Sequence, residues 1–145
     1  MFESDYIMRM ILQFLRFLRR VLEQRDRDPR EAALDLERQI GEAVNIDPEL
    51  FFALTPDSML TMLDLGGFNQ QLAEYMVRAM ALDISYLDEA ELTQRAELRR
   101  LQLNGLIEAF DLDLKPDDLT YEAIEAFANN QGDDEEFEPD TTSSV

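Results

Sequence analysis

A group of carboxylates late in the sequence has the spacing of a calcium-binding loop. Asp111, Asp113 and Glu122 stand at the first, third and twelfth positions of an EF-hand pattern. Lys115 then falls where a further oxygen ligand belongs, and Pro116 replaces the glycine that makes the sharp turn of such a loop. We therefore interpret this stretch as a helix end followed by a proline-initiated helix, and we expect no metal site.

Other catalytic chemistry has little support in the sequence. There is no His and no Cys, which removes imidazole bases, thiolate nucleophiles and the usual ligands of zinc and haem. No glycine-rich phosphate loop and no nucleophile elbow occurs. Among 32 acidic residues some carboxylates are bound to lie in pairs, so such pairs do not indicate catalysis. A hydrolase that uses only carboxylates is an alternative, but no motif indicates one. We expect a protein that is not an enzyme and that uses no cofactor.

Charge is distributed unevenly along the chain. Residues 1–30 carry 7 Arg against 5 acids, whereas the remaining residues carry 6 basic side chains against 27 acids. A net charge of −19 repels polyphosphate, because nucleic-acid binding depends on Lys and Arg that neutralise phosphates. We expect no nucleic-acid partner, and we favour partners that are basic or uncharged.

The elements that must position any site are helices. Only 5 Gly and 5 Pro occur, and no stretch alternates between apolar and polar residues as a half-buried strand does. Asp28, Asp47 and Thr55 each precede a proline, which is typical of a capping residue before the first helical position. We predict an all-α fold in which residues 1–128 form one compact domain of six or seven helices. The predicted helices are 5–24, 29–44, 48–54, 56–65, 69–82, 86–110 and 116–129.

The end of the chain differs from this domain in composition. Residues 129–145 contain several acids, no basic residue and a single aromatic, Phe137. Such a segment buries too little apolar surface to offset the entropy lost on ordering. We predict a flexible, disordered acidic tail.

Three predicted helix ends have a similar sequence. Residues 43–47, 79–83 and 109–113 each read Ala, apolar, any residue, Ile or Leu, Asp. This pattern resembles the close of the second helix in tetratricopeptide repeats, where a small residue lets neighbouring helices approach closely. The resemblance implies stacked helical hairpins over part of the chain. The alternative is an antiparallel helical bundle without repeats, in which helices ending this way are common.

The first predicted helix, 5–24, is amphipathic and basic. Arg9, Gln13, Arg16 and Arg20 form a narrow polar stripe, with Arg19 at its edge, and most of the remaining circumference is apolar. We favour a helix packed within the domain, with its arginines against acidic side chains of other helices. A surface that pairs with a second copy or another protein is one alternative, and an interfacial membrane anchor is another. The acidic body disfavours the anchor because anionic lipids would repel it.

The opening MFESDYIMRMI resembles the start of an uncharacterised family of small helical bacterial proteins, which begin Met-Phe-Glu-x-Asp-Tyr-Ile/Leu-Met-Arg. The resemblance is close over the first 11 residues and loose beyond them. It implies a helical fold with repeat-like character and a common role for the opening helix. The family has no assigned activity, so the resemblance implies no functional residue.

These observations predict a noncatalytic helical protein–protein interaction module in the cytoplasm, since no secretory signal is recognisable. The alternative is a peripheral membrane-associated or self-assembling protein that uses the opening helix, and a homo-oligomer fits either function. Methionines in neighbouring predicted helices are explained most simply by core packing, although Met-rich surfaces also serve as adaptable binding grooves. The candidate interaction residues are Arg9, Arg16, Arg19, Arg20, Met62 and Met76.

Overall fold

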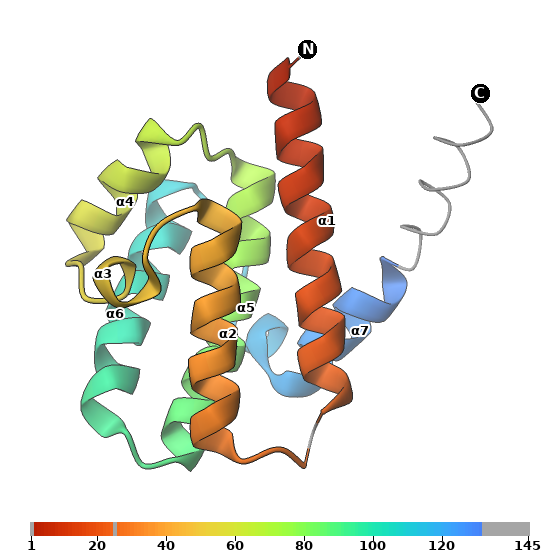
Figure 1. Ribbon diagram of the computed structural model, residues 1–145, viewed down its shortest axis with the longest axis vertical. Helices are drawn as coiled ribbons and strands as arrows, with labels where there is room; N and C mark the ends of the chain where they lie inside the picture. The colour runs from red at the N-terminus through yellow and green to blue at the C-terminus, as the bar shows by residue number, and fades with distance from the viewer. Residues whose placement is uncertain (1, 25, 132–145) are drawn as a thin grey trace.

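The computed structural model describes residues 2–24 and 26–131, and its regular secondary structure is helical (Figure 1). No strand occurs within these two ranges, so the predicted all-α class is confirmed. The predicted tail lies almost entirely outside the described residues. The elements are α1 (Phe2–Glu23), α2 (Pro29–Val44), α3 (Pro48–Phe51), α4 (Pro56–Leu65), α5 (Gln70–Glu89), α6 (Thr93–Ala109), the 3-10 helix η1 (Pro116–Leu119) and α7 (Tyr121–Asn130).

The helix starts that the sequence marks with a cap and a proline are confirmed. The Asp28 carboxylate accepts a hydrogen bond from the N–H of Glu31 at 3.1 Å, and Asp47 accepts one from Leu50 at 3.1 Å. Thr55 does the same at the start of α4. Each side chain satisfies a backbone donor that the first helical turn leaves without a partner. Short-range chemistry therefore fixes where α2, α3 and α4 begin.

The predicted boundary between helices 69–82 and 86–110 is wrong. Helix α5 continues through Asp83 to Glu89, and the chain reverses at residues 90–92 instead. Glu91 has a left-handed backbone, with φ of 61°, and the N–H of Leu92 donates to the carbonyl of Leu87 at 2.9 Å. This is the usual geometry of a helix end, but a non-glycine residue occupies the left-handed position. The turn therefore leaves no glycine signal in the sequence.

Two further predicted helices differ from the structure, one in length and one in continuity. The predicted helix 48–54 contains only α3, and the predicted helix 116–129 is divided into η1 and α7. Thr120 separates these last two elements, because its side-chain oxygen accepts a hydrogen bond from the N–H of Ala123 at 3.1 Å. A threonine that caps a new helix ends the preceding turn.

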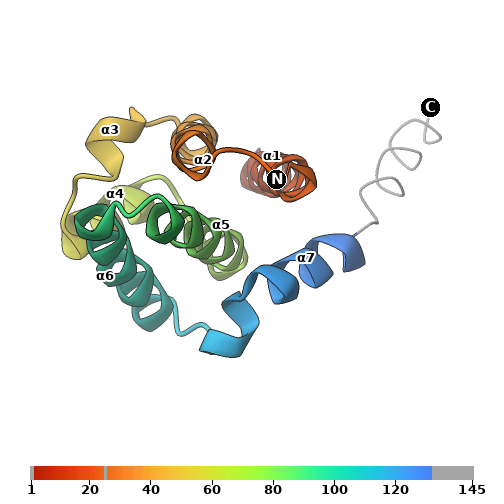
Figure 2. The same cartoon turned by 90° about the horizontal axis from the view of Figure 1, so that it is seen from below.

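The helices pack in two rows with α7 across one side. Figure 2 shows α1 beside α2, with α5 and α6 below them. Helix α5 is central, since it contacts α1, α2, α6 and α7. The short helix α3 contacts α2, and α4 contacts α6. The core lies between the rows and includes the fully buried side chains Leu36, Ile40, Met76, Met80 and Leu87.

The opening helix is packed within the domain, as the favoured interpretation expects. Its buried side chains include Phe14, Phe17 and Leu18, and it contacts α2, α5 and α7. Helix α7 is tied to its end by a hydrogen bond of 2.8 Å from the Tyr121 hydroxyl to the carbonyl of Leu22. The apolar faces of α1 therefore serve the core of this chain.

The three similar sequence stretches have different structural roles. The stretch at 43–47 spans the end of α2, and the stretch at 109–113 begins at the last residue of α6. The middle stretch, 79–83, lies inside α5, so its interpretation as a helix end is wrong. Ala43 and Ala79 are buried, whereas Ala109 is exposed. The tetratricopeptide-like repeat stays a hypothesis, because only two of its copies end a helix.

Candidate functional site

Arg99 occupies the centre of a buried polar network that joins four parts of the fold. Its side chain is 2% exposed. Its Nε donates to Asp83 on α5 at 2.9 Å, and its Nη2 donates to Glu37 on α2 at 2.8 Å. Its Nη1 donates to the carbonyl of Phe52 at 3.1 Å and to Gln102 at 2.9 Å. A buried guanidinium is stable only when its donors are satisfied, and this one is held from α2, α5, α6 and the end of α3.

Two acidic side chains share this guanidinium. Burial raises the pKa of Asp83 well above its usual range, and the charge and hydrogen bonding of Glu37 raise it further. Arg99 opposes this shift with smaller contributions. Burial and the adjacent Glu37 therefore oppose ionisation of Asp83, whereas its contact with Arg99 favours ionisation.

Gln102 extends the network to the connection between α3 and α4. Its Nε2 donates to the carbonyl of Phe52 at 3.1 Å and to that of Leu54 at 2.7 Å. The Phe52 ring also lies under Arg99, with 4.4 Å from its centroid to the guanidinium carbon. A short connection without regular structure thereby has its buried carbonyls satisfied by side chains of α6.

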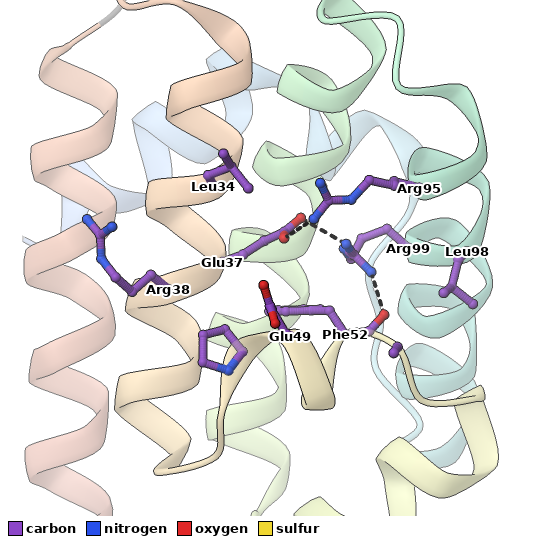
Figure 3. Close-up of a pocket in the computed structure, with 10 residues that line it drawn as sticks. Leu34, Glu37, Arg38, Glu49, Phe52, Arg95, Leu98 and Arg99 are labelled. Atoms are coloured by element: carbon purple, nitrogen blue, oxygen red, sulfur yellow. Dashed lines mark hydrogen bonds and ion pairs between the residues drawn. The ribbon is translucent and has the colours of Figure 1, made fainter.

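A groove lies above this network, between α2, α3 and α6 (Figure 3). We call it the α2–α6 groove; its volume is about 410 Å³. Figure 3 shows Arg95 and Arg99 reaching from α6 toward Glu37 on α2, with Leu34 above Glu37 and Glu49 below it. The lining residues are Leu34, Glu37, Arg38, Pro48, Glu49, Phe52, Ala53, Arg95, Leu98 and Arg99.

A close backbone approach at Gly41 sets the wall formed by α3. A Cβ atom added to Gly41 would lie 2.8 Å from the carbonyl oxygen of Ile46 and 3.0 Å from two carbons of Pro48. Only glycine allows the chain to turn back against α2 this tightly. The turn itself is made by Asn45, whose left-handed φ of 61° ends α2. Gly41 thus positions Pro48 at the edge of the α2–α6 groove.

The arginines predicted to form an interaction surface lie elsewhere, on α1. Arg9, Arg16 and Arg20 are exposed. Within the described residues, Arg9 and Arg20 form no ion pair, so the expected pairing with acidic helices is not found for them. Arg19 is partly buried, and its Nε and Nη2 donate to the carbonyl of Ala128 at 3.2 and 3.0 Å. Arg19 therefore holds α7 through the backbone carbonyl of Ala128.

The two methionines proposed for the same surface do not come together. Met76 is fully buried between the helix rows, so its assignment to a surface is wrong. An unbranched thioether fills such a core position well. Met62 is partly exposed and lines a separate shallow hollow on α4, together with Leu54, Ser58 and Thr61. The structure thus divides the candidate set among α1, α4 and the core.

In the acidic stretch that resembles a calcium loop, Asp118 bonds to the backbone of its own turn. Asp118 accepts a hydrogen bond from the N–H of Lys115 at 2.8 Å, which starts η1. Within residues 2–24 and 26–131, no three acidic side chains are grouped so that they could hold a metal ion. In the same ranges, every helix is too short or too polar to cross a membrane.

Sequence reasoning did not identify Glu37, Asp83 or Arg99. A signal was nevertheless present in α6, where Arg99 shares a helical face with Ala96, Leu103 and Leu106. A charged residue on an otherwise apolar face indicates a buried ion pair or a functional group. Its partners on α2 and α5 could be identified only from the tertiary contacts.

No protein-family model matches this chain, and the searches of curated proteins and of solved structures also found no match. The fold and the groove therefore define the protein at the level of class: an all-α domain with a surface groove above a buried arginine–carboxylate network.

Proposed function

We propose that this protein is a noncatalytic protein–protein interaction module and that the α2–α6 groove is its binding site. The observation that carries the proposal is the combination of a rigid polar floor with an apolar rim that solvent can reach. Arg99 fixes the floor through hydrogen bonds to three other elements. Leu34 at the rim is 45% exposed, and Leu50 on the neighbouring helix α3 is 56% exposed. Exposed apolar groups beside a concave site are typical of surfaces that bind a partner.

The groove supports binding better than it supports chemistry. Its carboxylates are Glu37 and Glu49, and Glu37 is already bound to Arg95 and Arg99. A general base must accept a proton from a bound substrate, and an ion-paired carboxylate at a groove floor is poorly suited to do so. The groove offers no hydroxyl, imidazole or thiol nucleophile among its lining residues. Its side chains can recognise a ligand by shape and charge.

Site-specific photo-crosslinking in the cell of origin tests this proposal. A photoreactive residue at Leu34 should give a discrete crosslinked band, because this side chain lies at the rim of the groove. The matched control is the same residue at Leu65, which is 80% exposed on α4 and does not line the groove. The Leu34 band should also disappear when Leu98→Asp places a charge in the groove. Equal labelling at both positions, or no labelling at Leu34, would overturn the proposal.

A second candidate function uses the N-terminal end of α1. Tyr6 and Met8 are 43% and 40% exposed there, next to the exposed Arg9. This combination of apolar and basic side chains suits self-association or contact with an anionic membrane surface. Light scattering with and without vesicles of phosphatidylserine and phosphatidylcholine tests it. This second function predicts that the protein dimerises or binds the vesicles and that Met8→Glu abolishes the interaction. A protein that stays monomeric and does not bind the vesicles would contradict it.

A further inference from the structure

Arg95 brings a positive charge to the α2–α6 groove and shares the carboxylate of Glu37 with Arg99. Arg95 Nη2 donates to Glu37 Oε1 at 2.9 Å, while Arg99 Nη2 donates to Glu37 Oε2 at 2.8 Å. One carboxylate therefore serves two guanidinium groups. Asp83, the other acid bound to Arg99, is fully buried on α5. Of the two guanidinium groups that share Glu37, Arg95 is the one that reaches solvent, with 43% of its side chain exposed, whereas Arg99 is 2% exposed.

A second carboxylate of α2, outside the lining of the groove, also binds two arginines. Asp35 on α2 binds both Arg27, at 2.9 Å, and Arg38. Arg38 lines the groove with its stem, but Figure 3 shows its guanidinium turned away from Arg95. It therefore adds to the positive potential around the groove without pointing at the same ligand group. Glu49 at the opposite edge is the acid that reduces this potential.

The local excess of arginine contrasts with the rest of the protein. The chain has a net charge of −19, so most of its surface repels an acidic ligand. Elsewhere on α6, Arg100 pairs with a carboxylate of its own, Asp88. A ligand carboxylate would therefore be attracted to Arg95 and repelled by most other surfaces, and such contrast favours one binding position.

Arg95 also has the donors that a ligand carboxylate requires. Within the described residues it uses Nη2 for Glu37, and its Nε and Nη1 donate to no other group. A guanidinium presents five N–H donors in a planar fork that matches a carboxylate. Leu34, Leu98 and the Phe52 side chain supply apolar surface within the same groove. Its volume of about 410 Å³ lies in the range of pockets that enclose small ligands or a few side chains.

From this geometry we infer that the α2–α6 groove binds an acidic peptide segment of a partner protein. The segment presents a large apolar side chain to Leu34 and Leu98 and a neighbouring Asp or Glu to Arg95. This inference rests on the proposed function and names the chemistry of its ligand.

Selection from a randomised library of short linear peptides, displayed on phage, tests the inference with the full-length protein. The expected result is a set of peptides enriched in Asp or Glu next to Leu, Ile, Phe or Met. Their binding, measured by fluorescence polarisation with synthetic copies, should weaken as salt is added, because screening reduces the attraction between partly exposed charges. A peptide with Gln in place of the acid should bind more weakly.

Charge reversal in the groove provides the decisive comparison. Arg95→Glu should weaken binding of the selected acidic peptides at least about tenfold, because an attractive contact becomes repulsive. The matched control is Arg30→Glu, which makes the same change in net charge at an exposed position of α2 outside the groove. Arg30→Glu should leave the affinity almost unchanged. Arg95→Gln keeps the test valid if Arg95→Glu does not fold, as thermal unfolding would show.

The outcomes separate the two proposals. Selected peptides that lose affinity with Leu34→Asp but carry no acid, and that ignore Arg95→Glu, would overturn the inferred ligand chemistry while supporting the groove as a binding site. Equal weakening by Arg95→Glu and Arg30→Glu would show a nonspecific charge effect and would also overturn the inference. Failure of Leu34→Asp to affect any selected peptide would contradict the inference and the proposed function together.

Discussion

Arg99 and Asp83 form an ion pair inside the protein, with 2.9 Å between Arg99 Nε and Asp83 Oδ2 and side-chain exposures of 2% and 0%. The pair joins α6 to α5, and Glu37 adds α2. Ionic groups this deeply buried depend on one another, because water cannot replace a missing partner. The network is therefore both the floor of the groove and a condition for the three helices to pack together.

Removal of the central guanidinium should be strongly destabilising. Arg99→Met keeps much of the side-chain volume but leaves Asp83 and Glu37 buried without their main partner. We expect a loss of about 3–5 kcal/mol in the free energy of unfolding, measured by urea denaturation. Arg100→Met is the matched control, since Arg100 pairs with Asp88 at the surface with 45% of its side chain exposed. A loss of less than about 1 kcal/mol is expected there. Similar losses for both variants would contradict the greater contribution of the buried network to stability.

The stability of the protein should depend on pH through Asp83. Burial, with Glu37, raises the pKa of Asp83 in the folded state above the ordinary value of 3.8, so the folded protein binds the proton more tightly than the unfolded chain. Stability from this group is present at low pH and is lost as pH rises from 3.8 through the raised folded pKa. Asp83→Asn should remove this dependence. Urea denaturation across this window should show the wild-type advantage over Asp83→Asn shrinking as pH rises.

Asp35 should show the opposite dependence. Burial would raise the pKa of its carboxyl, but the hydrogen bond and charge of Arg27, with the charge of Arg38, lower it below 3.8 overall. Its contribution to stability is present above 3.8 and is lost as pH falls through the lowered folded pKa. The wild-type advantage over Asp35→Asn should therefore shrink as pH falls below 3.8. A wild-type advantage that moves in the same direction for both residues would contradict the assigned shifts.

A methyl group at Gly41 should disturb the wall of the groove. The added Cβ of Gly41→Ala would lie 2.8 Å from the backbone oxygen of Ile46, and backbone cannot move aside as a flexible side chain can. We expect a loss of about 1–3 kcal/mol in the free energy of unfolding, as for overpacked cores. At Gly66 the nearest atom to an added Cβ is 3.5 Å away, so Gly66→Ala should be tolerated. Equal effects at the two glycines, in thermal or urea unfolding, would refute this account.

Phe127 should hold α7 against the rest of the domain. Its ring lies 5.3 Å from that of Tyr75, centroid to centroid, and the guanidinium carbon of Arg78 is 3.6 Å from its centroid. Such aromatic and cation–π contacts each contribute about 0.5–2 kcal/mol. Phe127→Ala should therefore speed amide hydrogen exchange within Tyr121–Asn130 by about tenfold while leaving exchange in α5 unchanged. Asn129→Ala, at an exposed position of the same helix, is the control and should change neither.

Features governed by neighbouring residues could be predicted from the sequence. Asp28, Asp47 and Thr55 each cap a helix one residue before a proline, and such caps can be predicted because their hydrogen bonds lie within a single turn. The turn at Glu91 could not be predicted in this way, since a non-glycine residue there adopts a left-handed backbone that its own sequence does not favour. The sequence pattern also predicts a helix end at Asp83, because Asp is uncommon in a helix interior. An Asp inside a helix is explained only by the arginine it meets across the fold.

The candidate site was less predictable than the fold. The sequence directed attention to the arginines of α1 and to Met62 and Met76, which the structure places on separate surfaces or in the core. The groove instead combines residues of α2, α3 and α6. The all-α class and most helix starts can be predicted from the sequence, because hydrophobic periodicity and capping act over a few residues. That Glu37, Asp83 and Arg99 meet is a result of helix packing, because the attraction between buried charges depends on distances that the three-dimensional fold sets.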